Sequence, residues 1–134
     1  MGVRTAGPFN SGAAVGANGV ATANTNSTIK IKGWIVGVYV KYNDSPPAAT
    51  TDVTVATLGT SPAPPSETIL SLVDGATDGW RYPWTAVHST LGVALTYDGT
   101  HPICAPTPID DLIKVTIAQA NAADNVDVWL LIED

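Results

Sequence analysis

The stretch TIKIKGWIVGVYVKYN, residues 28–43, decides the fold class. Up to Lys32, isoleucine alternates with lysine, which is the two-residue period of a half-buried β-strand. After Gly33 the period changes, and one face then carries Trp34, Val36, Val38 and Val40, while the other carries Ile35 and Tyr39. A β-bulge at Gly33 or Gly37 would produce this change. Alternatively, the opposed sheet covers one face of this strand and a second subunit covers the other.

The remainder of the chain repeats this strand character in short segments. We expect strands at 52–58, 68–74, 89–99, 111–120 and 125–134, and a weak first strand near 20–26. The last two form an antiparallel hairpin in this interpretation. In the segment 89–99, one face would hold Leu91, Val93, Leu95 and Tyr97. Proline-rich loops separate the segments, and none reads as a helix longer than a turn. The pattern predicts an all-β antiparallel β-sandwich, with a jelly roll or related Greek-key order.

Residues 1–27 differ from the rest because Gly, Ala, Asn and Thr dominate and few side chains are large enough to bury. We therefore expect an extended N-terminal arm or an edge segment over 1–27, mobile unless docked, and a single β-sandwich domain over 28–134. The length of 134 residues suits one such domain.

Charge is scarce and unevenly placed. Only 13% of the residues are charged, against roughly 25% in an average soluble domain. Residues 1–43 carry +4 and the remainder carries −10. So little charge favours a chain that covers part of its surface with partners. A basic front on an acidic body would suit head-to-tail subunit contacts or an arm that lies on an acidic partner, although random scatter of few charges explains this distribution equally well. Few cations and a pI near 4.5 argue against nucleic-acid binding.

The sequence shows neither a signal-peptide pattern nor an apolar run long enough to cross a bilayer, so we expect folding in a cytosol and no membrane contact. The single cysteine, Cys104, excludes an internal disulfide framework.

Motifs for chemistry are weak. His101 and Cys104 form the nearest nucleophile–base pair, but prolines interrupt their loop. His88 could join these two as zinc ligands without a recognised spacing. Asp74 and Asp78 lie in a DGATDG turn that lacks most of a calcium loop. We predict no catalytic residue, no metal site, no cofactor and no enzymatic activity.

The densest run is DGWRYPWTAVH, residues 78–88. Along an extended chain, Trp80, Tyr82 and Trp84 would share one side. Three interpretations remain for these rings: packing within the domain, an interface with a subunit or partner, and a platform for sugar rings.

The segments TTDVTV, TLGVAL and DLIKVTIAQANAADNVDVWLLIE, in this order and with their proline-rich loops, resemble small structural proteins of tailed bacteriophages. The type most similar is the capsid decoration, or cement, protein with a jelly-roll-like β fold. The resemblance covers roughly residues 28–133 and concerns strand rhythm, without a chemical motif.

This resemblance implies a non-enzymatic virion protein on the capsid exterior, made in the host cytoplasm. It implies binding to the major capsid protein lattice, self-association as a homotrimer, and an N-terminal arm on the shell. The alternative is a carbohydrate-binding or adhesion module that uses the aromatic platform. We expect the partner interface to involve Arg4, Phe9, Lys30, Lys32, Trp34, Trp80, Arg81, Tyr82 and Trp84.

Overall fold

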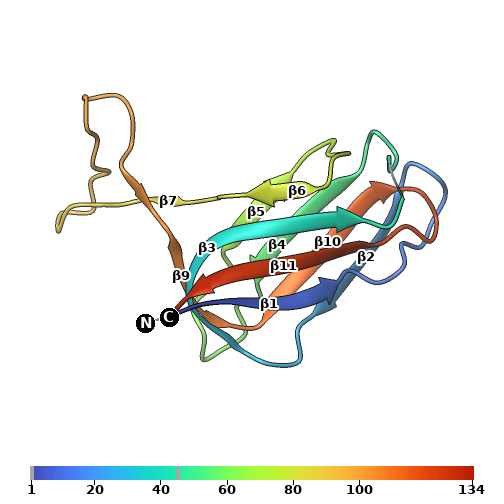
Figure 1. Ribbon diagram of the computed structural model, residues 1–134, viewed down its shortest axis with the longest axis horizontal. Helices are drawn as coiled ribbons and strands as arrows, with labels where there is room; N and C mark the ends of the chain where they lie inside the picture. The colour runs from blue at the N-terminus through green and yellow to red at the C-terminus, as the bar shows by residue number, and fades with distance from the viewer. Residues whose placement is uncertain (1, 45) are drawn as a thin grey trace.

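The computed structural model describes residues 2–44 and 46–134 and consists of two antiparallel sheets packed face to face (Figure 1). The first sheet has the order β1 (Val3–Asn10), β11 (Val126–Glu133), β3 (Ile31–Tyr42) and β6 (Gly79–Arg81), and β9 (Thr107–Asp111) also pairs with β3. The second sheet has the order β2 (Ala21–Asn26), β10 (Ile113–Ala120), β4 (Asp52–Thr57) and β5 (Thr68–Leu72). No helix occurs among the described residues. The predicted all-β sandwich is confirmed.

The two closing strands show how the core forms. Alternate residues are buried along both, including Val115 and Ile117 in β10 and Val128 and Leu130 in β11. The predicted hairpin between these strands is wrong, because β10 pairs with β2 and β4 while β11 pairs with β1 and β3. Each strand has one apolar face, and the two faces are buried together when the strands lie in opposite sheets. The connection between them passes through Ala123 at a φ of 69°.

Strand β3 contains the predicted bulge, but at a different residue. Leu131 pairs with Gly37 and the next residue of β11, Ile132, pairs with Ile35, so Val36 is the extra residue. The bulge puts Ile35 on the same buried face as Val38 and leaves Trp34 outside. The predicted common face for Trp34 and Val38 is therefore wrong, because alternation does not continue through a bulge.

The N-terminal segment is not an extended arm in this structure. Strand β1 is an edge strand of the first sheet, along β11, and β2 is an edge strand of the second, along β10. The weak strand expected near 20–26 is confirmed as β2. Between the two strands the backbone N–H of Ser11 donates to the carbonyl of Val126 at 3.0 Å, and Ala14 is buried. Small side chains suffice there because backbone pairing, rather than side-chain volume, holds these edges.

The largest departure from the expected strands lies between β6 and β9. Residues 85–106, here called the extension, leave the sandwich and stand clear of both sheets (Figure 1). Their two short strands, β7 (Thr85–Ala86) and β8 (Cys104–Ala105), pair only with each other. The strand predicted over 89–99 does not form; its residues make isolated bridges such as His88 with Ala94. At the base, the hydroxyls of Thr85 and Thr107 hydrogen-bond to each other.

Candidate functional site

Three aromatic side chains form a row across the outer side of the first sheet. The strand register places Trp129 of β11 opposite Tyr39 of β3, and Tyr39 opposite Trp80 of β6. Tyr39 meets both neighbours edge-on, with ring centroids 5.7 Å from Trp129 and 5.3 Å from Trp80. Edge-to-face pairs at this separation are favourable and hold the rings in fixed orientations. The row therefore runs across three strands that are already fixed by the core.

Tyr82 extends the row along the sheet edge. Its ring is nearly parallel to that of Trp80, with an interplanar angle of 12° and centroids 6.4 Å apart. Both rings lie over Gly37, where an added Cβ would be 3.0 Å from Cε1 of Tyr82 and 3.4 Å from Cε3 of Trp80. Glycine at this position lets the rings approach the backbone of β3. We call Tyr39, Trp80, Tyr82 and Trp129 the aromatic face.

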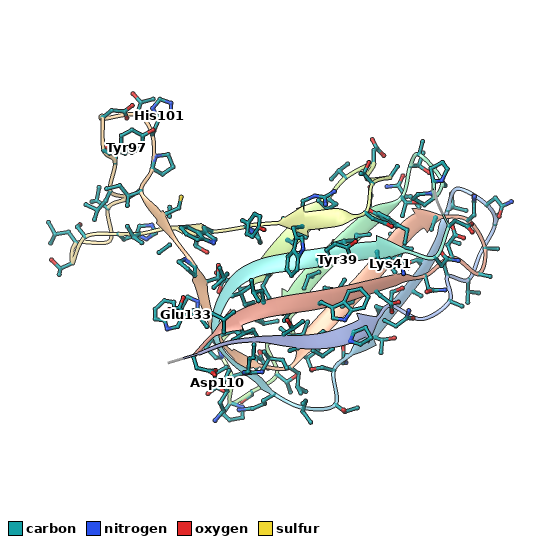
Figure 2. All side chains as sticks on the ribbon, in the orientation of Figure 1. Tyr39, Lys41, Tyr97, His101, Asp110 and Glu133 are labelled. Atoms are coloured by element: carbon teal, nitrogen blue, oxygen red, sulfur yellow. The ribbon has the colours of Figure 1, made fainter. Side chains whose placement is uncertain are left out.

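A shallow hollow of about 410 Å³ lies over this face, lined by Thr5, Tyr39, Lys41, Trp80 and Trp129. Trp80 is 43% and Tyr82 62% exposed, so their rings are open to a ligand. Figure 2 shows Tyr39 and Lys41 along β3 on the same outer side of the sheet.

Polar groups border this hollow. The Lys41 ammonium can donate hydrogen bonds, and the Thr5 hydroxyl can donate and accept them. Asp127, opposite Lys41 in the register, accepts a hydrogen bond of 2.8 Å from Nδ2 of Asn10. The arrangement combines apolar ring surface with hydrogen-bonding groups at its border.

Trp84 and Arg81, which the sequence grouped with these rings, are placed differently. The backbone N–H of Trp84 donates to the carbonyl of Tyr82 at 2.9 Å, a tight turn around Pro83 that interrupts the extended chain. The Trp84 indole N–H instead donates to the carbonyl of Val36 at the bulge, at 3.0 Å. Arg81 pairs with Val38, so its side chain leaves the sheet on the core side, and its Nη2 donates to the carbonyl of Thr77 at 3.0 Å.

The other predicted interface residues do not line the hollow over the aromatic face: Arg4, Phe9, Lys30, Lys32 and Trp34. Arg4 donates to the carbonyl of Lys32 at 2.9 Å, and Lys30 lies 4.0 Å from a carboxylate oxygen of Asp110. Arg4, Phe9 and Lys30 line a second hollow of about 430 Å³ beside β1. Among the nine predicted residues, the structure thus brings Trp80 and Tyr82 together in the aromatic face and Arg4, Phe9 and Lys30 together at the second hollow, and their contact with a partner stays a prediction.

The imidazoles and the thiol lie in the extension. His101 hydrogen-bonds through Nδ1 to the Asp98 carboxylate, and its ring stacks on Tyr97 with centroids 5.7 Å apart. The backbone N–H of His101, then its side chain and the backbone N–H of Thr100, lower the pKa of Asp98. Within residues 2–44 and 46–134, no three His, Cys, Asp or Glu side chains gather as a metal-binding group. No helix in this part of the chain is long and apolar enough to cross a membrane.

Sequence reasoning missed Tyr39, Trp129, Lys41 and Thr5 as members of the site. A signal was available for Trp129, because it alternates with Val128 and Leu130, which are both buried. Tyr39 lies between Val38 and Val40 in the same way. What the sequence lacks is the register that puts Tyr39, Trp80 and Trp129 side by side.

Comparison with protein-family models finds no match, and comparison with curated proteins finds none either. Among solved structures, the chain is similar to one described as "Family 16 Carbohydrate Binding Module-2". The TM-score is 0.39 and the sequence identity 13%, over 87% of this chain and 73% of that chain. The function of the aromatic face is therefore inferred from its own contacts.

Proposed function

We propose that the protein is a non-enzymatic carbohydrate-binding module and that the aromatic face is its binding site. The observation that carries this proposal is the row Trp129–Tyr39–Trp80, which is fixed by the register of three strands, with Trp80 exposed and Tyr39 and Trp129 half-buried. The C–H surface of a pyranose ring packs against an aromatic ring, while its hydroxyls need polar partners. Here the Lys41 ammonium and the Thr5 hydroxyl supply such partners at the border of the hollow.

The shape of the site favours part of a longer glycan over a small enclosed ligand. The rings extend from β11 across β3 to β6 on an outer sheet surface rather than inside a pocket. Binding rather than hydrolysis is expected because glycoside cleavage uses two carboxyl groups that flank the bond. The residues that line the hollow include no carboxylate, and Asp127, opposite Lys41, is a single carboxylate rather than a pair.

The proposal is tested with Trp80→Ala and a panel of soluble polysaccharides in affinity gels, followed by titration calorimetry on the best ligand. We expect wild type to be retarded and Trp80→Ala to lose about 5- to 150-fold in affinity, since a nucleic-acid base stacked on one aromatic side chain contributes about 1–3 kcal/mol. Trp34→Ala is the matched control, because Trp34 is 48% exposed but lies outside the face. No retardation of wild type by any glycan, or equal loss in both variants, would contradict the proposal.

A second function is favoured by a different observation, the exposed apolar side chains of the extension. In the single chain, Leu91 is 88% and Tyr97 71% exposed, which favours a protein whose extension is buried in contacts with protein partners. Together with the resemblance noted above, this supports a non-enzymatic structural protein that decorates a phage capsid by binding the major capsid protein. Such a protein would be made in the host cytoplasm and reside on the virion exterior.

The second function predicts co-sedimentation of the purified protein with capsids that lack it. Replacing the extension with a short Gly-Ser linker should abolish this binding, whereas Trp80→Ala should leave it intact. Free protein in the supernatant at every concentration would exclude decoration and leave glycan binding untouched.

A further inference from the structure

The extension has an ordered backbone. Val87, Leu95 and Ile103, from three separate segments, are joined in a ring of backbone hydrogen bonds. The N–H of Val87 donates to Ile103 at 2.9 Å, that of Ile103 to Leu95 at 2.9 Å, and that of Leu95 to Val87 at 3.0 Å. Ordering these residues costs conformational entropy of roughly 1–2 kcal/mol each. A protein normally recovers this cost by burying apolar side chains.

The extension does not recover this cost within one chain. Every residue from 90 to 104 is exposed, and Leu91, Val93 and Tyr97 are among the most exposed apolar side chains of the described residues. The extension contributes no residue to the core. A two-stranded ribbon without a packed face is marginally stable in water at best. Its apolar side chains therefore require a surface from another molecule.

Charge indicates what that surface is. Asp98 is the only Asp, Glu, Lys or Arg in residues 85–106, so the rest of the chain carries a net charge of −5. Two copies that met through the acidic parts of their sandwiches, residues 44–84 and 107–134, would bring like charges together, and a contact through the basic residues 1–43 would leave the extension uncovered. Two extensions can meet with little repulsion, and the sandwiches stay apart because the extensions project from them (Figure 1). The 22 residues of the extension also match the roughly 20–30 residues per side of a stable protein interface.

We propose that the extension is a self-association element whose apolar side chains are covered by the extension of a second copy. The proposal does not depend on either function above. It adds a consequence to glycan binding, because copies joined at their extensions present several aromatic faces at once, whereas in capsid decoration the same side chains would contact the capsid instead. Binding at one site then raises the effective concentration of the ligand at the linked sites, so the overall affinity rises without a new contact.

The test uses the full chain in sedimentation equilibrium over a wide concentration range. Wild type should show at least twice the chain mass of 13.8 kDa. A variant with Leu91→Asp and Val93→Asp should return to 13.8 kDa, because the charges would be buried at the contact. The matched control is Val20→Asp with Val73→Asp, which places two charges at exposed valines of the sandwich region and should stay associated. Circular dichroism checks that both variants keep the sandwich.

A second measurement locates the contact. Cys104 is the single cysteine and is exposed on β8, so a nitroxide label can be attached there without mutation. Dipolar coupling between labels of different copies should appear in wild type and vanish in the Leu91→Asp, Val93→Asp variant. A wild type that is monomeric at all concentrations overturns the proposal, and so does association that survives the charges in the extension. Glycan titration on the Leu91→Asp, Val93→Asp variant tests the aromatic face separately, because glycan binding by a single chain does not require self-association.

Discussion

The aromatic face and the extension both expose apolar side chains, but they differ in what lies behind them. Tyr39 and Trp129 belong to β3 and β11, whose inward residues such as Val40 and Leu130 are fully buried. Leu91 and Tyr97 have no core behind them. A rigid support holds rings in position for a ligand without ordering cost on binding, whereas an unsupported apolar segment becomes stable by being covered. This difference is why we assign a ligand to the first surface and a second copy to the other.

The largest expected effect is a loss of stability when a buried residue beneath the aromatic row is truncated. Leu130→Ala removes a side chain with no exposure, next to Trp129 in β11. We expect the free energy of unfolding to fall by about 2–5 kcal/mol, from lost burial and the cavity left behind. Leu91→Ala in the extension should change it by less than about 0.5 kcal/mol in the monomer. Urea unfolding of both variants, at protein concentrations low enough for the wild type to be monomeric, measures this contrast, and similar losses would show that the extension has a supporting core.

A smaller effect is expected from Gly37, which lies between the core and the rings. In Gly37→Ala, the new methyl group would lie 3.0 Å from the ring of Tyr82 and move it off the sheet. Overpacking of this kind costs about 1–3 kcal/mol, and glycan affinity should fall as the rings separate. Gly2→Ala is the control, since nothing lies within 4 Å of the added Cβ. Unchanged affinity in Gly37→Ala would mean that the position of Tyr82 does not matter for binding.

A rise in pH should change the stability of the two regions in opposite directions. In the sandwich, Asp124 is 4% exposed, and burial raises its pKa, followed by the contact with the Asp44 side chain. The folded state then binds this proton more tightly than the unfolded state, whose aspartate pKa is about 3.9. Stability therefore falls as pH rises from that value through the raised pKa. Asp124→Asn should flatten this dependence when thermal unfolding is followed as pH rises from the ordinary aspartate pKa towards neutrality.

The smallest effect belongs to the tip of the extension, where the sign is reversed. Hydrogen bonds from His101 and Thr100 lower the pKa of Asp98, so the ionised carboxylate favours the folded tip. This contribution is complete above the ordinary aspartate pKa and is lost as pH falls through the lowered value. Asp98→Ala should increase hydrogen exchange of the Thr100 and His101 amides at neutral pH without changing the global unfolding midpoint. A shift of that midpoint would mean that tip and sandwich unfold together.

The sequence alone determined most of the sandwich. Alternation predicted strands at 52–58, 111–120 and 125–134, which the structure contains as β4, β10 and β11, because a sheet with one buried face imposes a two-residue period on its side chains. The chain carries this period locally, residue by residue. The same rule failed for residues 89–99. Leu91 and Tyr97 follow the two-residue period, but this segment pairs with no strand of the sandwich and its side chains pack on no core.

Only the tertiary structure decided how the strands combine. The bulge at Val36, the assignment of β10 and β11 to opposite sheets and the row Trp129–Tyr39–Trp80 all depend on pairing between residues far apart in the chain. A period of two says which side chains share a face but not which strand lies alongside. The physical reason is that register follows from burying all apolar faces together, and this condition involves the whole chain at once.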